Sequence, residues 1–553
     1  MSFFEKHQVV IDKAIAAVAE RTFYAQYPEH PKFYGKEVAE RGQQNFEQLL
    51  GKPFELPLQG NGSGRVGQEK SPYTGEALGI DYPKYEVNEL IGNAQAAMKS
   101  WKKTSPQERA GILVETIESM KEVFHEIAHA TMHTTGQAYM MSFQASGPHA
   151  ADRALEALVL AYQEVSRFPE SAVWEKPMGK VTEVVRKTWK PVPKGVSLAV
   201  GVSTFPIWNM VPGIYASLMT GNPVVVKPHP LSILPMAILI KEMQKVFEAA
   251  GLSPHLIQLA ADNADEPITK TLAEHDATKV IDFTGGNAFG DYIESLEAKG
   301  KTTFTEKAGV NTVILDSVTD FKGVAQNLSM SMCLYSGQMC TAPQNIFIPE
   351  DGIETADGKM SFDEVCQNLK KAVTGLVSHP KAGPGVLGAI QSEATYQRGL
   401  DAKAKGAEVL LEPIEVNNPE FPKARILSPT ILVANAEQVD LFGEECFGPV
   451  VFLIKTKNTQ ESIDIAQKMA AEHGAITCGA YATDEELQNN IAEAMEATFT
   501  PVTFNYSGNM LLMNQNAAFS DFHVTGGNAA GNASLSNPEF VIKRFVWVGH
   551  KFK

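Results

Sequence analysis

Cys340 is the residue of this chain whose surroundings best suit covalent chemistry. It lies in the segment SGQMCTAP, where Gly337 permits a tight turn and small neighbours leave room for a substrate. If the thiol stands at the start of a helix, exposed backbone N–H groups lower its pKa and make it a better nucleophile. The alternative is a buried structural cysteine, which is how Cys333, in an apolar stretch, is interpreted.

Two glutamates occupy positions where a carboxylate can act on a substrate or ligand. Glu306, in FTEKAGVN, directly follows an expected strand and becomes a general base if burial raises its pKa. Glu445, in GEECFGPVV, precedes the stiff turn Phe447-Gly448-Pro449, which can hold it against a ligand hydroxyl. Taken alone, each of them is better interpreted as a solvated surface residue.

The sequence also contains a weak indication of a nucleotide-binding site. Lys227, in GNPVVVKPHP, ends an apolar strand, and ligands of α/β sheets bind beyond the carboxyl ends of strands. No G-x-G-x-x-G fingerprint directly follows one of the expected strands to open a helix. The glycine-rich turn Thr284-Gly285-Gly286 opens a helix and can receive a pyrophosphate or a nicotinamide.

A competing metal motif lies upstream. His125-Glu126-Ile127-Ala128-His129 matches H-E-x-x-H, the pattern of two zinc ligands and a general base on one helix. The extended pattern is missing, because Met132 and Thr135 replace its Gly and its third His. A downstream ligand such as Glu156 stays open, but the polar face of an amphipathic helix is the plainer interpretation, and we expect no metal.

These residues need a scaffold of alternating strands and helices. Such alternation predicts parallel α/β units, one before and one after residue 342. The apolar strand segments are 196–202, 222–228, 280–286, 311–316, 344–349, 428–434, 449–455, 476–482 and 501–507. Helical spacing over 96–130, with Ser105-Pro106 as a helix start, predicts a helical layer. The alternation over 180–194 predicts an exposed hairpin suited to assembly.

The composition of the chain limits the classes of molecule that it is expected to bind. The chain has 553 residues, 48 basic and 64 acidic side chains, and a net charge of −16. This acidity argues against nucleic-acid or membrane-surface partners and favours small-molecule chemistry. Charges interrupt the N-terminal stretch and no 18-residue apolar run occurs, so a cytoplasmic protein is expected. The five cysteines form no C-x-x-C pair, so reduced thiols are expected.

Taken in order, the motifs FPIWN, GNPVVVKP, FTGG, a Glu after a strand, GQMC and EECFGPV resemble the aldehyde dehydrogenase superfamily. The resemblance runs from about Tyr73-Thr74-Gly75-Glu76 to the C-terminus. The long N-terminal extension, FPIWN and the ending DFHVTGGNAAGNASL look most like the branch of phenylacetic acid degradation proteins of the N type. Six ordered motifs are far more specific than any one of them.

The resemblance implies roles for the residues. Cys340 would attack the aldehyde, and Glu306 would activate the water that hydrolyses the thioester and releases a free acid. Lys227, Glu445 and its neighbour Phe447 would hold the nicotinamide ribose and its surroundings. The implied activity is NAD(P)-dependent oxidation of an aldehyde, formed in aromatic-acid breakdown or carried as a ring-opened coenzyme A thioester semialdehyde.

The sequence departs from the family at three places. Thr204 stands at the position of the Asn that donates to the oxyanion, and Asn209 is the other candidate donor. Lys307-Ala308-Gly309 replaces the Leu-Gly-Gly that follows the family's Glu. Pro230 stands where NAD-preferring relatives commonly have Glu, so NADP is expected to be preferred, with His229 or Lys227 meeting its phosphate, while NAD stays possible.

The implied fold is α/β and aldehyde dehydrogenase-like, with two parallel or mixed-sheet domains, a β-hairpin oligomerisation element and an N-terminal helical extension. The expected ranges are 1–60 for the extension, 61–178 and 195–305 for the NAD(P)-binding domain, 306–535 for the catalytic domain, and 179–194 and 536–553 for the oligomerisation strands. Edge ribbons pair with other subunits, so self-association as a dimer or tetramer is expected. The other functional hypotheses are a zinc hydrolase and a non-catalytic binding relative.

Overall fold

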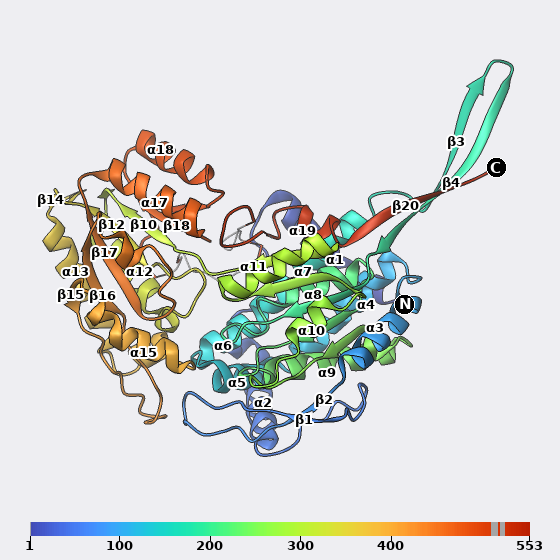
Figure 1. Cartoon of the computed structure of the whole chain (residues 1–553), viewed down its shortest axis with the longest axis horizontal. Helices are drawn as coiled ribbons and strands as arrows, with labels where there is room; N and C mark the ends of the chain where they lie inside the picture. Colours follow the sequence, from blue (N-terminus) through green and yellow to red (C-terminus); the bar gives the residue numbers. More distant parts are fainter. Residues whose placement is uncertain (1, 510–511, 513–517, 520–525, 533) are drawn as a thin grey trace.

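The computed structural model describes residues 2–509, 512, 518–519, 526–532 and 534–553. Two α/β bodies stand next to each other, and a thin ribbon of strands projects from the larger one (Figure 1). The predicted α/β class, with two sheets, a projecting hairpin and an N-terminal helical extension, is confirmed. Among the described residues, no helix combines the length and the apolar character needed to cross a membrane.

The first body is built on a parallel sheet of five strands in the order β7-β6-β5-β8-β9. Its strands are β5 (Val196–Val200), β6 (Val224–Lys227), β7 (Ile257–Leu259), β8 (Thr278–Thr284) and β9 (Thr302–Glu306). Its helices are α3 (Val87–Trp101), α8 (Val211–Met219), α9 (Leu234–Ala249), α10 (Thr269–Glu274) and α11 (Asn287–Ser295). Runs of buried Val and Ile on both faces are typical of a parallel sheet covered by helices.

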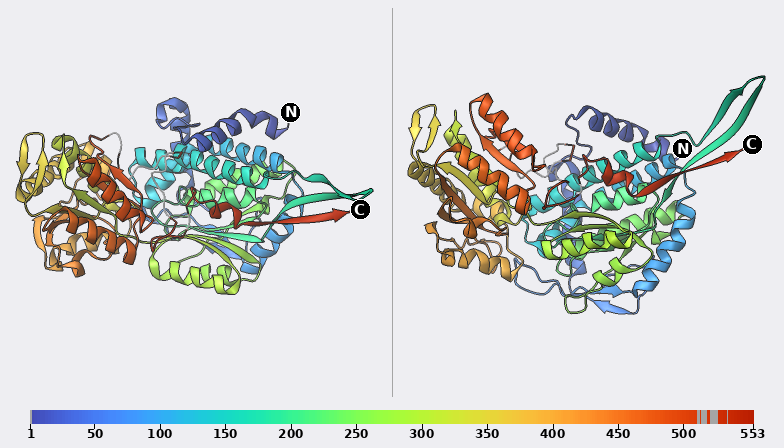
Figure 2. Two further views of the ribbon diagram at one scale, coloured as in Figure 1. Left: turned by 90° about the horizontal axis from the view of Figure 1, so that it is seen from above. Right: turned by 45° about the horizontal axis from the view of Figure 1, so that its top comes forward.

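A helical layer and the N-terminal segment complete this body. The layer comprises α4 (Pro106–Lys121), α5 (Phe124–Thr135), α6 (Tyr139–Ser146) and α7 (Pro148–Val165). The predicted start of α4 is confirmed, since the Ser105 hydroxyl accepts a hydrogen bond from the N–H of Glu108 at 3.2 Å. The N-terminal helices α1 (Phe3–Glu20) and α2 (Lys36–Leu49) lie against this layer (Figure 2). Ile11, Ala14 and Ala17 are buried in its core, so the extension is an integral part of the first body.

The second body contains a seven-stranded sheet in the order β15-β16-β17-β12-β10-β18-β19. All neighbouring strands are parallel except the β15–β16 pair. The strands are β10 (Thr312–Leu315), β12 (Asn345–Pro349), β15 (Glu408–Leu411), β16 (Thr430–Asn435), β17 (Val450–Thr456), β18 (Cys478–Tyr481) and β19 (Val502–Phe504). The helices are α12 (Phe321–Cys333), α13 (Phe362–Val377), α14 (Ala382–Leu387), α15 (Glu393–Asp401), α16 (Val439–Phe442), α17 (Thr459–His473) and α18 (Glu485–Glu496).

Two small sheets sit beside the two bodies. One pairs β1 (Gly64–Val66) with β2 (Tyr82–Lys84), and the other joins β11 (Ser317–Val318), β13 (Ile353–Thr355) and β14 (Gly358–Met360).

The projecting ribbon is a three-stranded antiparallel sheet of β3 (Ser171–Met178), β4 (Val181–Pro193) and β20 (Phe545–Phe552). It begins earlier than the expected 179–194, because the turn between its first two strands is made at Gly179, whose φ is +66°. The expected C-terminal strand segment is also shorter, since residues 539–542 form the helix α19 (Glu539–Ile542). Apolar side chains on the ribbon are exposed, including Val173 and Val181 at 64% and 63%.

Candidate active site

Strand ends of the first sheet bring the predicted groups to one edge. Lys227, Thr284 and Glu306 are the last residues of β6, β8 and β9. In this parallel sheet Thr284 pairs with Glu306, and Val200 of β5 lies between Lys227 and Phe283. The carboxyl edge of a parallel sheet is where α/β proteins bind ligands.

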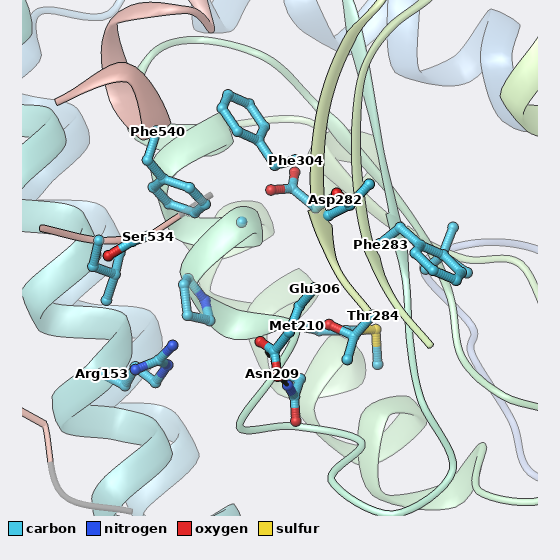
Figure 3. A pocket seen from close by; sticks show the side chains of 15 residues that line it. Arg153, Asn209, Met210, Asp282, Phe283, Thr284, Phe304, Glu306, Ser534 and Phe540 are labelled. Carbon is cyan, nitrogen blue, oxygen red and sulfur yellow. Dashed lines mark hydrogen bonds between the residues drawn. The ribbon is translucent and has the colours of Figure 1, made fainter. Parts of the chain in front are cut away.

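A cavity opens at this edge, and Glu306 and Asn209 face each other in it (Figure 3). The side-chain N–H of Asn209 lies 3.4 Å from each carboxylate oxygen of Glu306. Thr204 is buried but is not among the residues that line the cavity; its backbone carbonyl accepts a hydrogen bond from Gln137 at 2.7 Å. Of the two candidate oxyanion donors, the structure thus brings Asn209 to the carboxylate.

Cys340 does not stand at the start of a helix, so that expectation is wrong. Helix α12 ends at Cys333, and a short 3-10 segment, Leu334–Gly337, leads into the turn that carries Cys340. Tyr335, Ser336 and Gly337 all have positive φ, at 54°, 50° and 67°. Such strain persists only where the surroundings enforce it. A Cβ at Gly337 would lie 2.3 Å from the carbonyl oxygen of Gly448, so glycine is required there.

The thiol of Cys340 is hydrogen-bonded to the Glu306 carboxylate. Burial raises the pKa of Cys340 well above its usual range, and the charge and hydrogen bond of Glu306 and the charge of Glu445 raise it further. Arg153 acts in the opposite direction. The resting thiol is therefore protonated, contrary to the expected helix-terminus effect, and its proton already points at a carboxylate that can accept it.

Glu445 also acts electrostatically on Cys340, and it lines a second cavity together with Met339 and Phe447. Burial raises the pKa of Glu445 to about 7, while a hydrogen bond from the backbone N–H of Gly309 and the charge of Arg398 lower it. The Arg398 guanidinium also donates to the Phe447 carbonyl at 2.5 Å. The turn after Glu445 is thus fixed by side-chain contacts.

Lys227 and His229 are both engaged inside the protein. The Lys227 ammonium lies 2.7 Å from Asp262, both side chains are buried, and it also donates to the Pro228 carbonyl at 2.8 Å. Burial, aided by the charge of Lys227, lowers the pKa of His229 to about 4. The Nδ1 of His229 accepts the N–H of Leu231 at 3.2 Å, so the ring is neutral. Neither side chain presents an uncompensated positive charge to a phosphate.

The turn Gly285-Gly286 suits a nucleotide through its backbone. Gly286 is the N-cap residue of α11 and makes no side-chain cap, so the first N–H groups of that helix remain available to an anion. A Cβ at Gly286 would meet nothing within 4 Å, which shows open space beside this backbone. The N–H of Gly285 donates to the Glu306 carbonyl at 3.0 Å. The residues present therefore fit a pyrophosphate-bearing cofactor next to the thiol and carboxylate.

The C-terminal loop returns to this edge. The N–H of Lys307 donates to the Ala530 carbonyl at 2.6 Å, and Thr305 and Asn532 exchange hydrogen bonds. Gly285 and Gly531 thus both contact the backbone of Glu306. Residues 521–525 and 533 of the ending that resembles the phenylacetic acid branch lie outside the described residues. The expected domain range 306–535 differs from the structure at this end, because Gly531 pairs with Glu306 of the first sheet and Leu535 is buried in the core of the first body.

Arg153 is a site residue that sequence reasoning missed. It projects from α7 into the cavity of Glu306 and Asn209 (Figure 3), and its guanidinium stacks 3.9 Å from the ring centroid of Trp208. In the sequence it stands in ADRALEALVLAY, where it resembles an ordinary solvated charge on a helix. The one signal in the sequence was that Asp152, Arg153 and Glu156 interrupt a helix that is otherwise buried almost throughout.

The H-E-x-x-H motif gives no support to a zinc site. His125 Nδ1 is 2.7 Å from the Tyr139 hydroxyl, Glu126 accepts from Asn45 at 3.0 Å, and the His129 ring stacks on Phe46. Glu156 accepts a hydrogen bond from the N–H of Phe519 instead. Across the described part of the chain, no three His, Cys, Asp or Glu side chains are grouped to hold a metal ion.

All five cysteines are free thiols. Cys333 is fully buried in a hydrophobic core of the second body, and burial raises its pKa above the ordinary range.

The chain matches a model described as the Aldehyde dehydrogenase family over residues 62–512. It is 26% identical over 405 residues to the 1-pyrroline-5-carboxylate dehydrogenase of Bacillus subtilis (strain 168), covering 70% of this chain and 73% of that protein. It is also 26% identical over 454 residues to the NADP-dependent glyceraldehyde-3-phosphate dehydrogenase of Streptococcus equinus, covering 79% and 87%. A crystal structure of an NAD-dependent aldehyde dehydrogenase from Burkholderia multivorans superposes with a TM-score of 0.97 at 42% identity, covering 100% of this chain and 99% of that one.

Proposed function

The chain belongs to the aldehyde dehydrogenase family, and we propose that it oxidises its aldehyde to a free carboxylic acid through Cys340, with NAD or NADP as the hydride acceptor. The observation that carries this proposal is the hydrogen bond from the Cys340 thiol to Glu306 at the carboxyl edge of a parallel sheet. A nucleophile paired with a base at the carboxyl edge of an α/β sheet is the arrangement that covalent aldehyde oxidation needs.

The chain's own residues account for the proton and acyl steps. Glu306 takes the thiol proton as Sγ of Cys340 bonds to the carbonyl carbon, and the carbonyl electron pair moves onto oxygen. The Asn209 amide is the proposed donor to that oxyanion. When bound, the nicotinamide cofactor supplies the acceptor for the hydride that leaves the thiohemiacetal carbon. Once Glu306 has released the thiol proton to solvent, it takes a proton from a water whose oxygen bonds to the thioester carbon. The C–Sγ bond then breaks, the acid leaves, and Sγ takes that proton from Glu306.

For the cofactor we propose a preference for NADP. The support is the sequence Lys227-Pro228-His229-Pro230, which places no carboxylate where one would repel a 2′-phosphate. Lys227 and His229 add no support, because Lys227 is paired with Asp262 and His229 is neutral. Steady-state kinetics with both cofactors test it, and a clearly higher kcat/KM with NAD would overturn it.

For the substrate we propose an aldehyde of aromatic-acid breakdown, such as a ring-opened semialdehyde carried as a coenzyme A thioester. The motif resemblance supports this class, and the carboxylate of Glu306 supports release of a free acid. The test is a panel of aldehydes, including such thioesters, assayed with both cofactors and with Cys340→Ser as the control. The proposal predicts oxidation by the parent and none by the variant, and full activity of Cys340→Ser would contradict it.

We also propose that the ribbon joins subunits into a dimer or tetramer. Trp174, Met178 and Val184 are 43%, 55% and 49% exposed on strands that extend away from the body (Figure 1). A long exposed apolar ribbon of this kind is stable in water when another chain covers it.

A further inference from the structure

The proposed chemistry builds negative charge in a pocket that already contains carboxylates. As Cys340 reacts, charge develops first on Sγ and then on the oxygen of the bound carbonyl. Glu306 from β9 and Glu445 from the loop before β17 both raise the pKa of the thiol, Glu306 also through a hydrogen bond. A thiolate and an oxyanion formed near these acids need a compensating cation, because nearby like charges disfavour further negative charge.

Most cations of this region are held by carboxylates of their own. Lys227 is bound by Asp262 at 2.7 Å, and Lys307 by Asp291 at 2.7 Å. Arg544 makes two contacts with Asp282, at 2.7 and 2.5 Å. Arg398, on α15, donates to the Phe447 carbonyl and faces Glu445. None of these contacts leaves its charge directed at the thiol.

Arg153 differs from them. Among the described residues, no carboxylate lies within ion-pair distance of its guanidinium, and its buried Nε has no hydrogen-bond acceptor. Stacking on Trp208 at 3.9 Å fixes the plane of the guanidinium, and the side chain reaches toward Glu306 and Asn209 (Figure 3). Its electrostatic partners are Glu156 on its own helix, Glu306 and Cys340. Burial lowers its pKa, yet an arginine in a protein keeps its charge.

We propose that Arg153 supplies the positive charge against which the Cys340 thiolate and the thiohemiacetal oxyanion form. This inference rests on the proposed role of Cys340. In the step concerned, the Sγ–H bond breaks and its proton passes to Glu306, the Sγ–C bond forms, and the carbonyl π pair becomes the oxyanion. Arg153 stabilises charge at both stages without exchanging a proton. It therefore acts on every aldehyde, whatever the charge of that aldehyde's far end.

The test compares Arg153→Met and Arg153→Lys with Arg167→Met, a control whose parent guanidinium is exposed and pairs with Glu164. The first readout is the pH dependence of Cys340 alkylation by iodoacetamide in cofactor-free protein, followed by mass spectrometry of the Cys340 peptide. The second is kcat and KM for pentanal, which is neutral, and for succinate semialdehyde, which is anionic.

For Arg153→Met, the alkylation midpoint should rise by about one pH unit or more, as expected for loss of a nearby opposite charge. The kcat should fall roughly 10- to 100-fold for both aldehydes, as for loss of an electrostatic contact to a developing charge. Arg153→Lys should lie between Arg153→Met and the parent, and Arg167→Met should match the parent.

If Arg153→Met changed neither the alkylation midpoint nor kcat, the proposal would be overturned. It would also be overturned if the only effect were a higher KM for the anionic aldehyde, because Arg153 would then be a substrate-binding group. If the parent oxidises no aldehyde, or Cys340→Ser stays active, the proposed function fails instead. The alkylation midpoint still reports on Arg153 in that case.

Discussion

Replacing Glu306 by Gln is expected to change two properties of Cys340 in opposite directions. The Glu306 carboxylate raises the thiol pKa both by its charge and by accepting the thiol hydrogen bond. A like charge at this range shifts a pKa by about 1–3 units, so removing it should increase the thiolate fraction at pH 7.5 by about 10-fold or more. Loss of a general base, in contrast, typically slows a step by about 10²–10⁴-fold, so thioester hydrolysis should slow by that factor.

Two assays separate these effects. Alkylation of the Cys340 peptide by iodoacetamide at pH 7.5 should be faster in Glu306→Gln than in the parent. Stopped-flow absorbance of the reduced cofactor should show a first-turnover burst followed by a slow steady state. Glu445→Gln is the matched control for alkylation, since it removes a more weakly acting charge that makes no hydrogen bond to the thiol, and its increase should be smaller. Alkylation that is unchanged or slower in Glu306→Gln would refute the thiol–carboxylate contact, and an unchanged steady-state rate would remove Glu306 from the hydrolysis.

Three further expectations concern the scaffold. Asp282→Asn should lower the free energy of unfolding by about 3–5 kcal/mol, because it leaves the fully buried Arg544 without its carboxylate; urea denaturation showing a loss below about 1 kcal/mol would contradict this. Burial lowers the pKa of three histidines to about 4, against about 6.5 in the unfolded chain: His125, His129 and His133. As the pH drops from about 6.5 toward 4, the unfolded chain therefore binds protons before the folded chain does, and the free energy of unfolding should fall. His129→Gln should make denaturation midpoints at pH 7.5 and 5 differ less than in the parent, and an equal or larger difference would count against the argument. Trp174→Glu on the ribbon should shift light-scattering mass toward the monomer, whereas an unchanged mass would remove that strand from the interface.

The scaffold of the site was predictable from sequence because its strands are buried on both faces. Continuous apolar runs such as those ending at Lys227 and Thr284 are typical of strands covered by helices on each side, and parallel connectivity then places their ends at one edge. The position of Glu306 at this edge follows from the same rule. The start of α4 was equally readable, because Ser105 and Pro106 act through local contacts only.

The features of the site that could not be predicted from sequence depend on contacts between segments that are far apart in the chain. The pKa of Cys340 follows from burial and two carboxylates that come from a different strand and a different loop. The charge of Arg153 matters only because α7 and β9 contribute residues to the same cavity, and nothing in the spacing of α7 shows which of its faces lines that cavity. The role of the N-terminal extension likewise could not be inferred from sequence; in the structure Gln26 donates its backbone N–H to Asp152, the neighbour of Arg153, at 3.0 Å.

The most direct test of the account is to identify the covalent intermediate. Glu306→Gln protein, mixed with NADP and an aldehyde that the parent oxidises, should be quenched in acid within the first turnover and digested for mass spectrometry. The account predicts an acyl group on the Cys340 peptide, at the mass of the aldehyde less its hydride, and an unmodified peptide in Cys340→Ser. An acyl group on another residue, or continued oxidation with Cys340 unmodified, would contradict it.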